Sequence, residues 1–249
     1  TSVVAVSFQA EVTAAVGAVP VMSSHPEEAR VIAGGADVLL LNTGMPVETS
    51  QRVFLEALGG LRKGKPCLLD AVGYGLTRFR TGWVDSLLAS GRITAVKGNE
   101  AEMARLGGTP GFMKGVESSG AREIEKAMNG ITEEKKVQVA LSTGEEDRVV
   151  YDGTLWKVRG GSPLLPKVPT SGCALGSVMA ACMAVADPFS AAVTALLAFS
   201  LAAERAGTAP WPASWRNAFV DTLASLDPGE LSAAMEPLVE GPCFLGRSS

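Results

Sequence analysis

The sequence predicts an α/β fold in which a mostly parallel central sheet carries helices on both faces. The first observation is a set of short apolar runs, five to seven residues long and without polar alternation, as is typical of strands covered on both faces. The second is that helical segments separate these runs through short connections. The third is that residues 1–249 contain no internal repeat, low-complexity tract or linker, which predicts a single domain.

Four apolar runs are the expected parallel strands. In chain order they are Ala36–Asn42, Pro66–Asp70, Ile93–Lys97 and Val137–Ser142. Asp152-Gly153 is the strongest short hairpin signal in the chain, because a tight two-residue turn favours this pair. We therefore expect Val149–Tyr151 and Thr154–Val158 to form an antiparallel hairpin at one edge of the sheet.

Helical segments fill the intervals between these strands. They are expected at Pro26–Gly34, Pro46–Leu61, Trp83–Ser90, Asn99–Leu106 and Arg122–Gly130. From Cys173 onward the pattern is almost wholly helical, and its most apolar part, residues 174–203, is interrupted by Asp187-Pro188. Each half is shorter than the roughly 20 residues that a bilayer span needs. A helix pair in the core is therefore expected, and no membrane segment.

Composition argues against several classes of function. His25 is the single histidine, so one chain cannot form a multi-histidine metal site. The four cysteines, Cys67, Cys173, Cys182 and Cys243, show no C-x-x-C spacing, which argues against zinc ribbons and thioredoxin-type redox sites. A net charge of −4 without a block of Lys and Arg argues against a nucleic-acid partner. Unpaired cysteines are typical of a reducing cytoplasm, which is the expected location.

Two strand ends carry charged residues where α/β sheets bind ligands. Asp70 ends an apolar run and is followed by Gly73 and Gly75, which suits a magnesium or phosphate site, or equally a turn cap. At the next strand end, Lys97 would lie near phosphate and Glu102 near a hydrated magnesium ion. The structural alternative for Glu102 is a capping box, which Asn99 would complete at the start of a helix.

Two further loops are candidate anion sites. Thr143 follows the strand that ends near Ser142, and it either binds a nucleotide phosphate or only forms a turn. The loop Pro169–Ser177 is rich in small residues and opens the long apolar helix, and free N–H groups at such a helix N-terminus bind anions. The same position is expected to lower the pKa of Cys173. The loop is neither a Walker A loop nor a dinucleotide fingerprint.

Cysteine-nucleophile hydrolysis is an alternative use of Cys173. The imidazole base would have to be His25, which lies in an expected surface turn before a helix, and no local signature supports a Cys173–His25 dyad. The other cysteines are most simply explained as core or tail residues. Hydrolysis is therefore the weaker interpretation.

In this order, the motifs resemble the hydroxyethylthiazole kinases, thiamine-salvage enzymes of the ribokinase-like superfamily. The resemblance covers essentially the whole chain. The stretches that carry it are Gly17–Met22, Leu41–Gly44, Leu69–Gly73, Lys97–Glu102, Lys114–Ser118, Ser171–Leu175 and Ser214–Asp221. It implies transfer of the ATP γ-phosphoryl group to the hydroxyl of 4-methyl-5-(2-hydroxyethyl)thiazole, with Mg²⁺ as cofactor.

The resemblance also implies roles for single residues on the acceptor side. Met22, Gly44, Thr170 and Gly172 would line the thiazole pocket. The N–H groups of Gly172 and Cys173 would form an anion hole, with Cys173 at the position where related sugar kinases keep a basic aspartate. Both residues would be catalytic.

On the nucleotide side, the resemblance places Lys97 and Thr143 against ATP. Asp70 and Glu102 would organise magnesium and its waters. It further implies a homotrimer with active sites between subunits.

Several residues depart from the family pattern. Thr170 replaces a glycine, Lys97 replaces an arginine, and Ser7 and Glu11 replace asparagines. Two alternatives therefore stay open: a ribokinase-like kinase of hydroxymethylpyrimidine or pyridoxal, and a non-catalytic paralogue that binds ligand. Cys173, where those other kinases have aspartate, argues against the first alternative.

Overall fold

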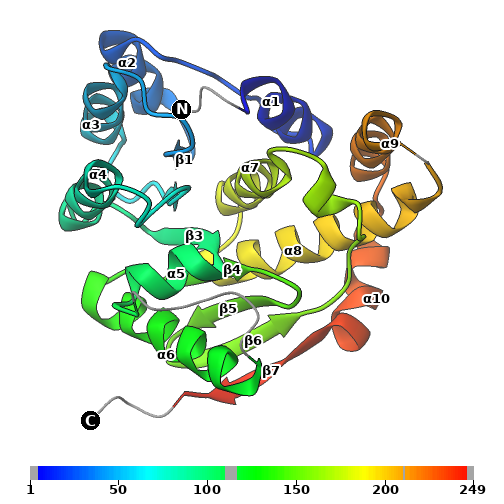
Figure 1. The fold of residues 1–249 in the computed structure, drawn as a ribbon. Coiled ribbons are helices and arrows are strands. Elements are labelled where there is room, and N and C mark those ends of the chain that lie inside the picture. Colours follow the sequence, from blue (N-terminus) through cyan, green and yellow to red (C-terminus); the bar gives the residue numbers. More distant parts are fainter. Residues whose placement is uncertain (1–4, 110–116, 210, 246–249) are drawn as a thin grey trace.

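The computed structural model describes residues 5–109, 117–209 and 211–245 (Figure 1). Within this part of the chain all strands belong to one seven-stranded sheet, ordered β1 to β7 as in the sequence. The strands are β1 (Leu39–Asn42), β2 (Cys67–Asp70), β3 (Ala95–Asn99), β4 (Val139–Thr143), β5 (Asp147–Tyr151), β6 (Thr154–Val158) and β7 (Val239–Phe244). Strands β1 to β4 pair in parallel, and β4 to β7 pair antiparallel. The predicted mostly parallel α/β sheet is confirmed.

The antiparallel end of the sheet differs from the prediction in one strand. The hairpin forms around Asp152 and Gly153, which have φ values of 48° and 67°. Beyond it lies β7, which the helical pattern of the C-terminal region does not predict. This strand contains Gly241-Pro242 and is largely exposed, so it lacks the apolar pattern by which strands are recognised in a sequence.

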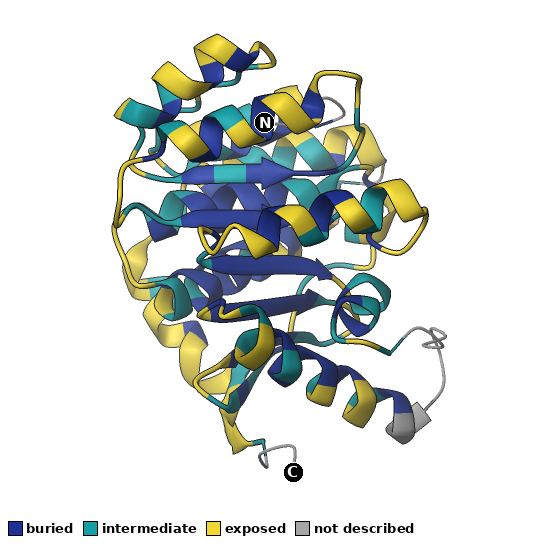
Figure 2. Ribbon diagram, turned by 90° about the vertical axis from the view of Figure 1, so that its left-hand side faces the viewer, coloured by how far each residue is buried: buried dark blue, intermediate teal, exposed yellow. Residues whose placement is uncertain are grey.

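Helices cover both faces of the sheet, as predicted (Figure 1). One face carries α2 (Pro26–Gly35), α3 (Ser50–Gly60), α4 (Arg78–Ala89), α5 (Glu100–Leu106) and α6 (Glu117–Lys135). The other face carries α1 (Val6–Ala15), α7 (Ser171–Met183), α8 (Pro188–Arg205), α9 (Pro212–Ala224) and α10 (Pro228–Leu238). Short 3₁₀ turns lie at Leu165–Lys167 and Ala206–Thr208. Figure 2 shows the central strands buried behind helices whose outer sides are exposed.

Two helices begin at residues other than those predicted. Helix α3 begins at Ser50, four residues after Pro46, so the start of that segment stays outside the helix. Helix α4 begins at Arg78, earlier than expected, because the Thr77 side chain accepts a hydrogen bond from the N–H of Arg80. The stretch Lys114–Ser118 lies outside the part of the chain whose side chains the structure describes.

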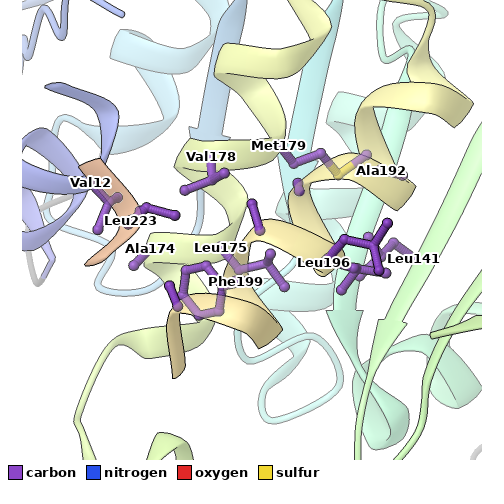
Figure 3. Close-up of a cluster of buried hydrophobic side chains, with 14 of the residues drawn as sticks. Val12, Leu141, Ala174, Leu175, Val178, Met179, Ala192, Leu196, Phe199 and Leu223 are labelled. Atoms are coloured by element: carbon purple, nitrogen blue, oxygen red, sulfur yellow. The ribbon is translucent and has the colours of Figure 1, made fainter. Parts of the chain in front are cut away.

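Helices α7 and α8 form the predicted apolar pair. Asp187 caps α8 by accepting hydrogen bonds from the N–H groups of Phe189 and Ser190. Figure 3 shows Leu196 of α8 packed with side chains of the sheet and of α7. Removing a buried leucine of this kind costs about 2–5 kcal/mol of unfolding free energy. In the described ranges no helix has the length and apolarity that crossing a membrane requires.

The register of the first three strands places polar residues side by side at the carboxyl edge of the sheet. Asn42, the last residue of β1, pairs with Asp70, the last residue of β2, and Asp70 pairs with Lys97 of β3. Neighbouring parallel strands thus bring an amide, a carboxylate and an ammonium group to the same carboxyl edge.

Candidate active site

Asn42, Asp70 and Lys97 form a buried polar cluster at the carboxyl edge of the sheet. The Oδ1 atom of Asp70 lies 3.2 Å from the Nζ atom of Lys97. The other carboxylate oxygen accepts a hydrogen bond of 2.8 Å from Asn42 Nδ2. The two charged side chains are 1% and 3% exposed, so almost no solvent screens them. This arrangement brings together two of the predicted site residues.

Burial and pairing oppose each other in this cluster. Burial raises the pKa of Asp70, and the Lys97 ammonium and the Asn42 amide work against that rise. Burial also disfavours the charge on Lys97, but the nearby Asp70 carboxylate, with a further contribution from Glu102, raises its pKa above the usual value. Lys97 is therefore a cation at neutral pH. A fixed cation in a water-poor site is suited to contacting phosphate oxygens.

Glu102 forms the capping box and also faces the cluster. Its Oε2 accepts a hydrogen bond of 2.7 Å from the Asn99 N–H, and its own N–H donates to Asn99 Oδ1 at 2.9 Å. Its Oε1 accepts a hydrogen bond of 2.7 Å from the N–H of Gly73 in the loop after β2. Burial raises the pKa of Glu102, and these two N–H donors oppose the rise. The side chain is thus held next to Asp70 by main-chain groups of two loops.

The N-terminus of α7 lies over the Asp70–Lys97 pair. A Cβ atom built on Gly172 would stand 3.9 Å from Lys97 Nζ, and one on Gly176 would stand 3.2 Å from Asp70 Oδ2. Only a residue as small as glycine lets the helix pass so close to the carboxylate at position 176. The predicted anion hole and the predicted charged residues therefore lie in one place.

The expected lowering of the Cys173 pKa is wrong. Burial raises the pKa of this thiol, and the neighbouring Asp70 and Glu102 carboxylates raise it further, against the Asn42 hydrogen bond and the Lys97 charge. The prediction considered the helix N-terminus alone and included neither the burial of the thiol nor the Asp70 carboxylate at the end of β2. Cys173 therefore rests as a neutral thiol beside the charged pair.

The loop that precedes α7 is held by specific contacts. Ser171 Oγ donates a hydrogen bond of 2.9 Å to the carbonyl of Leu165. From α1, Gln9 Nε2 donates one of 3.1 Å to the carbonyl of Cys173, and Gln9 is itself buried. Thr170 adopts a left-handed conformation with φ 69°, which is strained for a β-branched residue.

Thr143 ends β4 and stands opposite Asn99 in the strand register. Next to it, the N–H of Gly144 donates a hydrogen bond of 3.1 Å to Asp147 Oδ1, which closes the turn into β5. Arg148 pairs with Glu100 at 2.8 Å, and this ion pair joins the same turn to the start of α5. The turn is therefore fixed beside the Lys97 strand end.

Two residues of the site were missed at the sequence level. Asn42 Oδ1 accepts a hydrogen bond of 2.9 Å from the Gly44 N–H, so one amide links Gly44, Asp70 and Cys173. A polar residue ending an apolar run was the available signal. Arg80 donates from α4 to the loop that carries Gly44, and no local pattern indicates that contact.

Met22 lies apart from the other predicted site residues. It is half-buried and lines a cavity of about 650 Å³ between α1, α2 and α7, together with the exposed Val19 and Val21. Gly44, Gly172 and Cys173 do not line this cavity. Within one chain the structure does not bring Met22 to them.

The acidic pair fits a hydrated magnesium ion better than an all-protein cage. In the described part of the chain no three His, Cys, Asp or Glu side chains are arranged to hold a metal. Each oxygen of Asp70 and Glu102 already accepts one hydrogen bond and keeps one lone pair. Mg²⁺ commonly binds through one or two carboxylates, several waters and substrate phosphates, which matches this donor set.

Comparison with known proteins identifies the family. The hydroxyethylthiazole kinase family matches residues 1–229. The chain belongs to this family. The kinase of Thermoanaerobacter pseudethanolicus is 36% identical over 234 residues, which cover 92% of this chain and 88% of that relative. The kinase of Caldivirga maquilingensis is 37% identical over 220 residues, which cover 87% and 82%.

Solved structures agree with this assignment. The hydroxyethylthiazole kinase of Pyrococcus horikoshii OT3 superposes with a TM-score of 0.84 at 29% identity, covering 96% of this chain and 89% of that one. A Staphylococcus aureus pyridoxal kinase in complex with pyridoxal gives 0.58 at 15% identity over 79% and 81%, which shows a shared fold alone. The resemblance, the ribokinase-like fold and the kinase class are thus confirmed.

Two residues that depart from the hydroxyethylthiazole kinase pattern, Ser7 and Glu11, lie on helix α1. Glu11 of α1 forms an ion pair of 2.5 Å with Arg216 of α9, and the Arg216 guanidinium lies 4.4 Å from the centre of the Phe8 ring. Ser7 is exposed on the same helix. The acidic residue at position 11 therefore serves a contact between two helices.

Proposed function

We propose that this chain transfers the γ-phosphoryl group of ATP to the hydroxyl of 4-methyl-5-(2-hydroxyethyl)thiazole. The observation that carries the proposal is the convergence of the α7 N-terminus, the Lys97 cation and the Asp70 carboxylate at one sheet edge. The hydroxyl oxygen forms a bond to the γ-phosphorus, the bond from that phosphorus to the β–γ bridging oxygen breaks, and ADP leaves.

Charge stabilisation is the main task of the proposed site. Phosphoryl transfer asks for alignment and for neutralisation of charge on the moving group, with little covalent chemistry from the protein. The N–H groups of Gly172 and Cys173 would donate to its oxygens, and the Lys97 ammonium, close to position 172, would add a positive charge. Thr143, at the neighbouring strand end, would contact the nucleotide phosphates.

Magnesium would be held on the acidic side of this site. Asp70 and Glu102 would bind the ion or its waters through the lone pairs that their hydrogen bonds leave free. Bound Mg²⁺ would supply neutralisation of the nucleotide phosphates. Burial raises the pKa of Glu102, and a cation bound beside it would favour the charged carboxylate.

The proton of the alcohol needs only a weak acceptor. Cys173 stands beside the reacting groups, but its raised pKa keeps it mostly protonated near neutral pH. Late in the transfer the proton would pass to the thiolate fraction of Cys173 or directly to a phosphoryl oxygen. Cys173 is therefore proposed as a modest base that also orients the alcohol.

A homotrimer with shared sites would explain the place of Met22. Val19 and Val21 on its loop are 87% and 58% exposed, which suits contact with another subunit. The test mixes inactive Met22→Asp and Lys97→Met proteins and lets them exchange subunits. About a quarter of the sites then combine two native residues, and activity returns if Met22 serves its neighbour's site. No recovery, with exchange verified, contradicts the shared site.

The decisive experiment follows ADP formation with ATP, Mg²⁺ and a panel of alcohols. Turnover with the thiazole alcohol is expected. Binding of that alcohol in calorimetry without turnover would favour a non-catalytic paralogue. Turnover only with hydroxymethylpyrimidine or pyridoxal would overturn the assigned substrate.

A further inference from the structure

Arg80, in the first turn of α4, donates three hydrogen bonds to main-chain carbonyls. Its Nη1 atom donates to Thr43 O at 2.6 Å and to Val72 O at 3.0 Å, and its Nη2 atom donates to Gly44 O at 2.8 Å. Within the described residues, all hydrogen bonds of the guanidinium end on these carbonyls. Two of the carbonyls belong to the loop after β1 and one to the loop after β2. One side chain thus joins two strand-end loops.

Both loops lead directly to proposed site residues. The first carries Gly44, on the side proposed for the alcohol. The second continues from Val72 to Gly73, whose N–H holds Glu102 Oε1 at 2.7 Å. A Cβ atom at Gly73, where φ is 76°, would lie 2.9 Å from Arg80 Nη1, so glycine leaves the room that the guanidinium occupies.

We propose that Arg80 is a positioning residue for the phosphoryl acceptor. It holds the Gly44 and Gly73 loops at the separation at which the alcohol and the Glu102 carboxylate meet the N-terminus of α7. This inference rests on the proposed function, since it takes the alcohol to bind beside Gly44. The planar fork of arginine suits three carbonyls in two loops, whereas lysine offers a point charge and cannot reproduce the geometry.

Loss of a positioning residue lowers the reaction rate, whereas loss of a structural residue lowers the stability of the fold. The Arg80 side chain is half-buried at the edge of the fold and contributes nothing to either hydrophobic cluster. Its loss removes three hydrogen bonds to main-chain carbonyls, and the two loops lose their common anchor. A shift of about 1 Å in such loops costs on the order of 100-fold in rate.

The test compares Arg80→Lys and Arg80→Met with Arg78→Met, a control on the same helix turn whose side chain is exposed. For both Arg80 variants we expect kcat/KM for the thiazole alcohol to fall on the order of 100-fold, with the alcohol KM rising more than the ATP KM. Arg78→Met should behave as the wild type. Unchanged kinetic constants per folded enzyme, or equal increases of both KM values, would overturn the inference.

Hydrogen–deuterium exchange separates this inference from the proposed function. The N–H groups of Gly44 and Gly73 are hydrogen-bonded to Asn42 and Glu102, so their exchange reports the order of each loop. Faster exchange at residues 43–46 and 72–76 is expected in Arg80→Met and not in Arg78→Met. If the wild type phosphorylates no alcohol, the proposed function fails, and this comparison still decides whether Arg80 anchors the two loops. Equal exchange in the two variants would refute that anchoring role.

Discussion

The two ends of the sheet use charge in opposite ways. At the parallel end, Asp70 and Lys97 form one isolated pair with almost no solvent exposure. At the antiparallel end, Glu146 contacts Arg148, Lys157 and Arg159 in a network that water reaches. Burying the Asp70–Lys97 pair costs desolvation free energy that one ion pair must offset. In the network, Glu146 remains partly hydrated and interacts with several cations.

The pKa values of Asp70 and Glu146 are shifted in opposite directions. Burial raises the pKa of Asp70 despite its partner. Burial also acts on Glu146, but hydrogen bonds from Arg159 and Lys157 hold its pKa below the ordinary value. A lone buried pair is weak evidence for stability, so its presence at the carboxyl edge is better explained by chemistry. The network, in contrast, serves the fold.

Lys97→Met should have the largest effect, because it leaves Asp70 as an unpaired buried carboxylate. We expect the free energy of unfolding to fall by about 3–5 kcal/mol. The kcat/KM of the remaining folded enzyme should fall on the order of 100-fold or more, because the cation beside the anion hole is lost. Denaturant unfolding and steady-state kinetics measure the two effects. A stable and active variant would end the distinction between the two ends of the sheet.

Cys173→Ala tests the thiol beside the charged pair. A modest base accounts for about tenfold in kcat, less than a dedicated general base would supply. Because the pKa of Cys173 is raised, the wild-type kcat should increase toward alkaline pH, and the variant should lose that increase. The measurement is kcat as a function of pH. Unchanged activity would remove Cys173 from proton transfer.

Asp147→Asn tests burial of an acid beside the antiparallel network. Burial raises the Asp147 pKa to about 6 from an ordinary 3.8, so between these values the native state binds more protons than the unfolded state. Stability from this group is therefore present below pH 4 and is lost as pH rises to 6. The variant should remove that slope and gain about 1–2 kcal/mol at pH 7. Unfolding curves from pH 4 to 7 measure this, and an unchanged slope would contradict it.

Thr170→Gly tests the strained residue before α7. Glycine adopts the left-handed conformation without a Cβ penalty, although it loses more chain entropy on folding. The two effects together should increase the free energy of unfolding by up to about 1 kcal/mol, which raises the Tm by about 2–4 °C in a chain of this size. Calorimetry measures the shift. A lower Tm would show that the threonine side chain makes contacts that outweigh the strain.

Arg159→Gln should have the smallest effect. Arg159 pairs with Glu146 and Glu240, and its own side chain is 61% exposed. Exposed pairs of this kind contribute less than about 1 kcal/mol, and none of these groups belongs to the proposed site. Denaturant unfolding and kinetics should both give values near the wild type. A large loss of activity would show that the two ends of the sheet are coupled.

Local signals predicted the fold and the charged strand ends well. Asp70 and Lys97 end apolar runs, and the Asn99–Glu102 capping box is a signal within four residues. Contacts that join distant segments left no such trace: Arg80 reaches a loop 36 residues earlier in the chain. The Cys173 pKa was predicted wrongly for the same reason, because burial by distant segments and the Asp70 carboxylate on β2 raise it.

Strand β7 illustrates a different limit. Its residues Val239–Phe244 are mostly exposed and include a proline, so pairing with β6 defines the strand and its own apolar pattern does not. The position of Met22 was also beyond a motif match, since a motif gives the order of residues along the chain and not their distances in the fold.

We infer that the Asp70–Lys97 pair is present for phosphoryl transfer and not for stability. The direct measurement compares the double variant Asp70→Asn, Lys97→Met with the wild type in unfolding and in thiazole kinase activity. Since both charges are removed together, the unfolding free energy should stay within about 1 kcal/mol of the wild type or exceed it. The kcat/KM should fall by on the order of 1,000-fold or more. A double variant that keeps its stability and most of its activity would show that the pair is not needed for phosphoryl transfer.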